Sequence, residues 1–196
     1  MNRFSPPRIE TDPKHRFPWY VRLFLINQRR RYGRELEPAR LWGRTPKVFA
    51  ALSLLYAAMD RRGSPIEPAL RSLITVRVSQ INWCAFCIDI NGANCLKRGV
   101  TEEQLAALPD HQTSPLFDER IKAALAYAEA MTHSDLGVDD AVFARVKEHF
   151  DDDAIVELTA LVAYQNMSSK FNAALGVPAQ GFCRMPEPNP APRSDE

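Results

Sequence analysis

Apolar side chains recur at helical spacing along nearly the whole chain. The patterns predict helices over residues 19–38, 45–63, 118–133 and 138–150, and a longer one over 152–176. Residues that commonly start or stop helices stand at several of the expected ends, such as a Thr-Pro pair before one apolar run and a glycine after another. We therefore predict an all-α fold.

The segment 64–82 is the ambiguous part of this pattern. Its core, LITVRVSQI, alternates and is rich in β-branched residues, which is typical of a strand. We favour a helix because the neighbouring segments are helical and Pro68 suits a first helical turn. A shorter helix is expected over 84–99. Thr101 and Gln104 then form a capping-box pattern at the start of the next one.

Proline marks the two ends of the chain as irregular. Most of the 15 prolines fall within the first twenty or the last twenty residues. We expect three parts: an N-terminal arm with one helix over 1–44, a helical domain over 45–178, and an irregular Pro-rich tail over 179–196. The arm is expected to pack on the domain.

Composition and charge limit the binding partners and the cellular location that we expect. The 196 residues suit one domain, and 25 Lys and Arg residues balance 24 acidic ones. A net charge of +1 gives no reason to expect nucleic acid or an anionic membrane as a partner. The chain has neither a run of about 18 apolar residues nor a secretory-type leader. We predict a cytoplasmic protein, in which a close cysteine pair is more often catalytic or metal-binding than structural.

Two cysteines, Cys84 and Cys87, form a CxxC motif at the expected start of a helix, with Asn82 as the candidate cap. Unpaired N–H groups at a helix start favour a thiolate and lower the pKa of the first cysteine. Cys87 lies one turn further on the same face, so it can resolve a mixed disulfide. The pair suits disulfide exchange, or peroxide reduction through a sulfenic acid.

Two other roles for the pair remain open. A zinc site usually takes paired Cys or His ligands, but no second CxxC and no nearby histidine accompany this one. We therefore predict no metal and no cofactor. The pair could also be two small buried core residues, since cysteine is among the most buried residue types. Cys95 and Cys183 are each more easily explained as structural cysteines than as auxiliary thiols.

Three stretches resemble the carboxymuconolactone decarboxylase-like superfamily in its alkylhydroperoxidase D-like branch. They are LRSLITVRVSQINWCAFCIDIN, with RVSQINWCAFC its most specific part, then ALAYAEAMT, then IVELTALVAYQNMSSKFNAALGVP. The resemblance covers residues 45 to 178. It implies an alkylhydroperoxidase D-like helical bundle, a homo-oligomer, and a thiol peroxidase or disulfide reductase. Its partners would be a hydroperoxide or disulfide substrate and an external dithiol reductant.

The chain departs from the proton relay of that family. The family pattern has a glutamate twelve residues before the first cysteine, where this chain has Ser72, and a histidine four residues after the second, where it has Asn91. Some members also have a histidine just before the second cysteine, where this chain has Phe86. Ser72 and Asn91 can hydrogen-bond but cannot act as bases at neutral pH. A slow dithiol enzyme fits these residues better than a fast peroxidase.

Charged residues elsewhere could support the thiols. Arg77 lies two turns before Cys84 and could stabilise a thiolate, although a structural ion pair explains it as well. Glu129 and Glu157 could approach from other helices or could form salt bridges. Asp89 is expected to point away from the cysteine face, as a cap or a surface acid.

The leading hypothesis is a thiol-dependent oxidoreductase. By family analogy Cys87 faces the peroxide and Cys84 the reductant, whereas the helix-start argument makes Cys84 the more acidic thiol. The alternative is a non-catalytic oligomeric scaffold, a small-molecule binding protein or a redox sensor on the same fold. A lactone decarboxylase is disfavoured, because no histidine lies near the motif. The apolar faces of 45–63 and 153–176 favour self-association.

Overall fold

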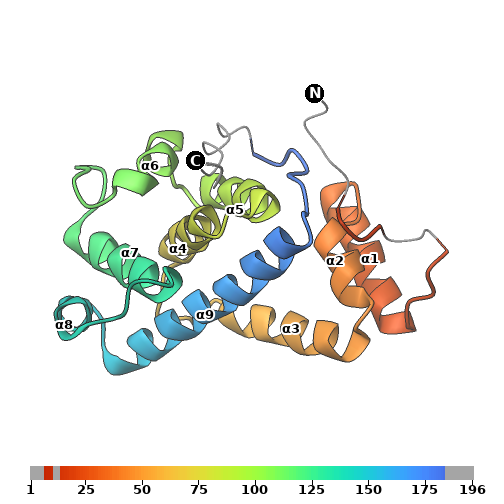
Figure 1. The fold of residues 1–196 in the computed structure, drawn as a ribbon, viewed down its shortest axis with the longest axis horizontal. Helices are drawn as coiled ribbons and strands as arrows, with labels where there is room; N and C mark the ends of the chain where they lie inside the picture. The colour runs from red at the N-terminus through yellow and green to blue at the C-terminus, as the bar shows by residue number, and fades with distance from the viewer. Residues whose placement is uncertain (1–6, 11–13, 184–196) are drawn as a thin grey trace.

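The computed structural model describes residues 7–10 and 14–183, and within them every regular element is a helix. The prediction of an all-α fold is confirmed. The elements are α1 (Trp19–Tyr32), α2 (Glu37–Gly43), α3 (Pro46–Met59), α4 (Pro68–Ile81), α5 (Ala85–Lys97), α6 (Glu102–Ala106), the 3-10 turn η1 (Leu108–Asp110), α7 (Glu119–Thr132), α8 (Asp140–Lys147) and α9 (Asp152–Ala174). Figure 1 shows α4 and α5 beside α9, with α6, α7 and α8 at one end and α1 and α2 at the other.

The ambiguous segment is helix α4, as favoured from the sequence. Pro68 occupies its first turn, where a missing N–H removes no helical hydrogen bond. The helix is buried on several sides, because it packs against α5, α7 and α9. Its β-branched residues therefore reflect burial rather than a strand, and Ile74, Val76 and Val78 are all fully buried.

The N-terminal arm contains two helices instead of the single one expected. The chain leaves α1 at Gly33, whose φ of 74° is a left-handed conformation that glycine adopts at little cost. It starts again as α2, with Pro38 in the first turn. Gly33 is a helix-stop signal and Pro38 a helix-start signal. Neither was used in the prediction, because the apolar pattern runs through both positions over 19–38. The arm packs on the domain, as expected.

Two apolar clusters make up the core. The larger one is built mainly from α4, α7 and α9. The smaller one joins the arm to α5, and it contains Val21 and Leu41 of the arm, both cysteines of the CxxC motif, and Val177 after α9. The cysteine pair therefore lies where the arm meets the bundle.

A C-terminal segment over 177–183 holds the arm in place. The Asp89 carboxylate on α5 accepts hydrogen bonds from the backbone N–H groups of Gln180 (2.7 Å) and Cys183 (2.6 Å). The Gln180 side chain in turn accepts from the N–H of Glu37 at the start of α2 (3.2 Å). Asp89 is only 6% exposed, so the expectation of a cap or a surface acid was wrong. Of the predicted tail, 179–183 is irregular and 184–196 lies outside the described residues.

Helix α3 is apolar but largely uncovered within a single chain. Leu54 is 74% exposed, and Val48 and Leu55 are 47% and 41% exposed. Within one chain only Phe49 and Met59 of this helix are buried. None of the helices in the described part of the chain combines the length and the apolar run that crossing a bilayer needs.

Candidate functional site

A tight turn between α4 and α5 presents the cysteine pair. Asn82 ends α4, and its side-chain amide donates to Asn166 (2.9 Å) and Ser169 (2.8 Å) on α9. Trp83 follows with φ 54°, an uncommon left-handed conformation for a large side chain. The N-cap of α5 is Cys84 itself. The expectation that Asn82 caps this helix was wrong, because its side chain anchors the turn to α9.

The two cysteines form a disulfide across the first turn of α5, with their Cα atoms 5.2 Å apart. The Cys84 sulfur also accepts the backbone N–H of Cys87 at 3.2 Å. After reduction, this N–H and the helix start would favour a thiolate at Cys84. Cys84 is 0% exposed and Cys87 is 3% exposed, so access to the sulfurs depends on an internal cavity rather than the outer surface.

Asn172 on α9 is a neighbour of the pair that sequence reasoning missed. Its side-chain N–H donates to the Cys87 sulfur at 3.3 Å, and the residue is 2% exposed. Its Oδ1 is buried without a hydrogen-bond partner. A donor aimed at sulfur favours the thiolate over the thiol. The only sequence signal was an amide among the apolar residues near the end of the long helix.

A pocket of about 300 Å³ opens beside Cys87. Residues of α1, α2, α3, α5 and α9 line it, and Cys84 is not among them. Its aromatic lining is Phe24, Tyr32, Trp42, Phe49, Tyr56, Phe86 and Tyr164, and its uncharged polar lining includes Asn27, Gln28, Ser53, Asn91, Asn94, Gln165, Ser168 and Asn172. The volume and this mixed lining are typical of small-molecule sites. Of the two sulfur-bearing residues, Cys87 is therefore the one on the pocket wall.

A second cavity of about 40 Å³ adjoins the pocket. Asn91 borders both spaces, and Ser72 borders the smaller one. The Ser72 hydroxyl donates to the carbonyl of Pro68 (3.0 Å) and accepts from Arg98 (3.0 Å). The two positions where the family pattern has its glutamate and histidine thus border the same small cavity, next to the pocket that Cys87 faces.

No residue that lines these two spaces is a free base. Neither lining contains a glutamate or a histidine, and Asp60 is ion-paired with Arg98 and Arg71. Burial raises the pKa of Tyr164 to about 12. Burial, helped by the Asp60 charge, also raises the pKa of Tyr56. Both phenols therefore stay neutral and act as hydrogen-bond groups.

Arg77 lines neither space. Its Nε lies 2.5 Å from the Glu129 carboxylate, and its Nη1 donates to Gln80. His111 lies 3.6 Å from the same carboxylate, and burial lowers the pKa of His111, so its ring stays neutral near pH 7. The geometry supports the structural explanation of Arg77.

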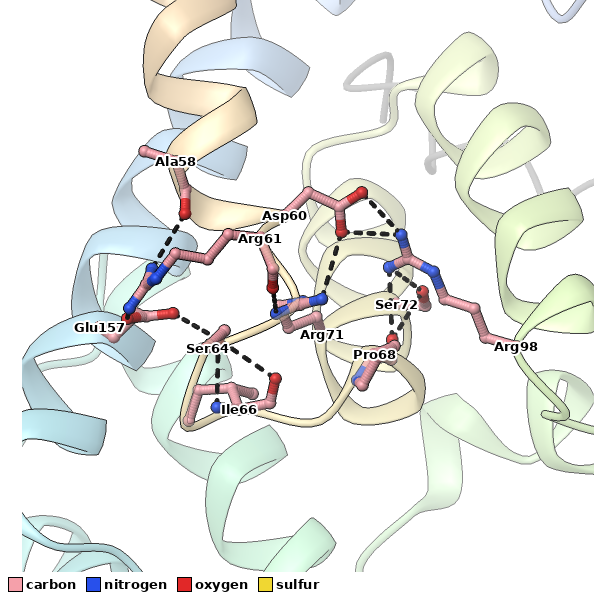
Figure 2. A network of polar contacts seen from close by, with 10 residues as sticks. All are labelled: Ala58, Asp60, Arg61, Ser64, Ile66, Pro68, Arg71, Ser72, Arg98 and Glu157. Atoms are coloured by element: carbon pink, nitrogen blue, oxygen red, sulfur yellow. Dashed lines mark hydrogen bonds and ion pairs between the residues drawn. The ribbon is translucent and has the colours of Figure 1, made fainter.

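The remaining candidate acid, Glu157, also forms an ion pair. Glu157 pairs with Arg61 (2.6 Å) and accepts from the hydroxyl of Ser64, as Figure 2 shows. Desolvation opposes ionisation of Glu157, but these two donors outweigh it and lower its pKa. Within the described ranges, no cluster of three or more His, Cys, Asp or Glu side chains could hold a metal ion.

The remaining cysteines differ from the pair. Cys95 is fully buried, and burial raises the pKa of its thiol to about 12, which supports a structural role. Cys183 lies in the C-terminal segment, where Asp89 holds its backbone N–H. Cys183 is close enough to Cys95 for the charge of one thiolate to raise the pKa of the other.

Known proteins resemble this chain in both sequence and structure. The model of the carboxymuconolactone decarboxylase family matches residues 46–130. The Escherichia coli protein YnjA is 41% identical over 175 residues, which is 89% of this chain and 96% of YnjA. An alkylhydroperoxidase AhpD core protein from Ralstonia eutropha, described as peroxidase-related, superposes with a TM-score of 0.80 at 19% identity, over 91% of this chain and 95% of that one.

A second structure, of the debrominase Bmp8, superposes with a TM-score of 0.74 at 21% identity, over 84% of this chain and 88% of that one. At these identities the two structures establish the fold alone, which is the alkylhydroperoxidase D-like fold. The family of the chain is shown by the family-model match and by the match along nearly all of YnjA. The chain therefore belongs to the carboxymuconolactone decarboxylase family.

Proposed function

We propose that the protein is a thiol-dependent oxidoreductase in which Cys87 attacks the substrate and Cys84 resolves the product. The observation that carries this proposal is the Cys84–Cys87 disulfide at the start of α5, with Cys87 on the wall of the 300 Å³ pocket. A nucleophile that faces a pocket, and a second thiol within bonding distance behind it, are the two parts that dithiol chemistry needs.

With a hydroperoxide as substrate, the steps balance without a cofactor. The Cys87 thiolate attacks the terminal oxygen, the O–O bond breaks, and the alkoxide leaves and takes up a proton as an alcohol. Cys87 is then a sulfenic acid. The Cys84 thiol attacks that sulfur, forming the disulfide and releasing water. An external dithiol reduces the disulfide by exchange. With a disulfide as substrate, the Cys87 thiolate attacks one sulfur and releases the other half of the substrate as a thiol. Cys84 then attacks the Cys87 sulfur of this mixed disulfide, which forms the Cys84–Cys87 disulfide and releases the second thiol.

The thiolates must form without the family's glutamate and histidine. The N–H of Cys87 points at the Cys84 sulfur, and the Asn172 amide points at the Cys87 sulfur. Both donors favour the charged form of the sulfur they contact, but neither can accept a proton. We expect a slower enzyme than one with a relay base, with a rate that follows the thiolate fraction.

The same proposal includes a cytoplasmic setting and a homo-oligomer. A cytoplasmic reductant would keep the pair able to cycle. The exposed apolar residues of α3, Leu54 above all, would be covered by a second copy of the chain.

A binding protein or redox sensor is the second candidate. The burial of both sulfurs favours it, and so does the aromatic lining of the pocket. A cysteine-to-alanine variant of Bmp8 was solved in complex with 2,3,4-tribromopyrrole, so a protein of this fold binds a small halogenated ring. A sensor would form the disulfide once per oxidant pulse without multiple turnover.

Turnover separates the two candidates. Reduced protein is mixed with dithiothreitol and a larger amount of cumene hydroperoxide, both in molar excess over the protein, and consumption of the hydroperoxide is followed over many equivalents. Mass spectrometry tracks the Cys84–Cys87 disulfide in the same samples. An enzyme consumes many equivalents, and the disulfide accumulates when dithiothreitol runs out. Consumption that stops at one equivalent, with the disulfide formed and not reduced by dithiothreitol, would support the sensor, and no reaction at the pair would support the binding protein.

A further inference from the structure

A buried arginine with an unsatisfied donor lies next to the small cavity. Arg71 is 5% exposed; its Nη2 lies 3.4 Å from Asp60, and its Nη1 donates to the carbonyl of Arg61 at 3.3 Å (Figure 2). Its Nε is buried and has no hydrogen-bond partner in the described structure. Buried donors in folded proteins are nearly always paired, so a missing partner at this position calls for an explanation.

The charges around the cavity are also unbalanced. The Nη2 atom of Arg98 donates to both carboxylate oxygens of Asp60, at 2.7 and 2.9 Å. The Nη2 atom of Arg71 lies further from the same carboxylate, at 3.4 Å from Oδ1. The residues that line the cavity thus supply two guanidinium groups and one carboxylate, an excess of one positive charge. A single carboxylate cannot pair fully with both arginines.

The size of the cavity limits what could supply the missing negative charge. A volume of 40 Å³ exceeds the roughly 10–15 Å³ that one water requires, but it is too small for a ring. A carboxylate group fits this space. It would also offer the two oxygens that match the fork of a guanidinium.

The cavity and the pocket that Cys87 faces share part of their walls. Tyr56, Asn91, Asn94, Tyr164 and Gln165 border both spaces. A ligand with an apolar body in the aromatic pocket could therefore extend a carboxylate past these side chains to the arginines. Ser72 keeps this end of the cavity open because its side chain is small.

We infer that Arg71 and Arg98 form an anion subsite that takes the carboxylate of an organic substrate whose reactive part lies against Cys87. The inference rests on the proposed function, since it names the substrate class for that site. Substrates would be carboxylic acids that carry an apolar, preferably aromatic, body. A neutral analogue of the same shape would fill the pocket but leave the arginines unsatisfied.

Binding to the disulfide form tests this without any turnover. The probes are ω-phenyl carboxylates with two to six methylene groups, each compared with its primary amide, in calorimetric titrations at fixed ionic strength. We expect the best carboxylate to bind at least tenfold more tightly than its amide, as a charge-assisted hydrogen bond suggests. Ser72→Glu places an internal carboxylate beside Arg98, and Arg98→Gln removes one guanidinium. Each of these two variants should remove most of the difference in affinity between the carboxylate and its amide.

Two controls make the result specific. Arg62→Gln removes the same charge from an exposed residue that borders neither space, and it should leave the tenfold ratio unchanged. Acetate tests whether a small anion suffices, and it should fail to compete with the phenyl carboxylates at equal concentration. Equal affinity for acid and amide, or a preference that survives in both Ser72→Glu and Arg98→Gln, would overturn the subsite. The hydroperoxide assay judges the proposed function separately, because these titrations need no thiol.

Discussion

The side-chain amide of Asn172 donates to the sulfur of Cys87, although 85 residues separate the two along the chain. The contact joins the long helix α9 to the cysteine turn at the start of α5. It is a donor to sulfur in a site that lacks the acid and the histidine of the family pattern. Under the proposed mechanism, such a donor would stabilise the Cys87 thiolate after reduction, but an amide N–H cannot accept a proton.

Replacing Asn172 by leucine should therefore affect the thiol more than the fold. Loss of one hydrogen bond to a charged sulfur, about 1.4 kcal/mol, would raise the pKa of Cys87 by about one unit. Alkylation of Cys87 in reduced protein should slow several-fold at pH 7. Thermal stability should change little, because the Asn172 Oδ1 already lacks a partner and leucine has a similar shape.

Ser168→Ala is the matched control for this change. Ser168 lines the same pocket from the same helix and should leave the pH profile of Cys87 alkylation where it is. An unchanged profile in Asn172→Leu would mean that the amide has only a structural role.

Each cysteine of the pair should be indispensable, for different reasons. Cys87→Ser removes the nucleophile and should abolish hydroperoxide or disulfide reduction, while Cys84→Ser should stop at a Cys87 sulfenic acid that dimedone can trap. Cys95→Ser is the control and should retain turnover. Full activity in either variant of the pair would rule out the two-thiol mechanism.

Restoring the family residues should raise the thiolate fraction. The double variant Ser72→Glu, Asn91→His introduces an acid and a base at two positions that border the small cavity. Asn91 also borders the pocket that Cys87 lines. The measurement is the rate of iodoacetamide alkylation of the pair from pH 5 to 10, which should reach half its maximum at lower pH than in the parent protein. An identical midpoint would show that these positions do not correspond to the relay of the family.

Cys95 should be the least reactive thiol. Burial raises its pKa to about 12, so at pH 8 only about one molecule in ten thousand carries the thiolate. Because the thiolate is the reactive form, native protein should label at the reduced pair and at Cys183 long before Cys95. Mass spectrometry after timed alkylation checks this order. Early labelling of Cys95 in folded protein would show that this part of α5 opens readily.

A charge on the uncovered face of α3 should prevent self-association. Leu54 is 74% exposed, so Leu54→Glu should leave the folded monomer intact while disrupting an apolar interface. Light scattering coupled to size exclusion gives the mass. The control Lys47→Glu changes the charge of another exposed residue on the same helix that is not apolar. A parent protein that is already monomeric would contradict the proposed oligomer.

Local signals predicted much of this structure. Apolar periodicity located the helices, and the Thr101–Gln104 capping box is present as expected. The CxxC spacing placed the pair at a helix start, because that inference needs only a few adjacent residues. Pro68 correctly favoured helix over strand for α4.

Contacts between distant segments could not be predicted in this way. Nothing near Asn172 in the sequence shows that it faces Cys87, and nothing near Asp89 shows that it holds the C-terminal segment. The arm was expected to pack on the domain, but its contribution to the pocket depends on where α1 and α2 come to rest. The shared cavity of Ser72 and Asn91 likewise depends on the packing of α4 against α5.

Most residues of the pocket wall come from other parts of the chain than the two cysteines. The residues that match the family model, 46–130, include both cysteines, whereas most of the residues that line the pocket come from α1, α2 and α9 outside that range. Most of the pocket wall is thus encoded outside the family-model segment, whereas both sulfurs and the two arginines of the proposed subsite, Arg71 and Arg98, are encoded within it. A chimera that carries residues 46–130 between the flanking helices of a relative should keep the preference for a carboxylate and acquire the relative's preference for the apolar body of the substrate.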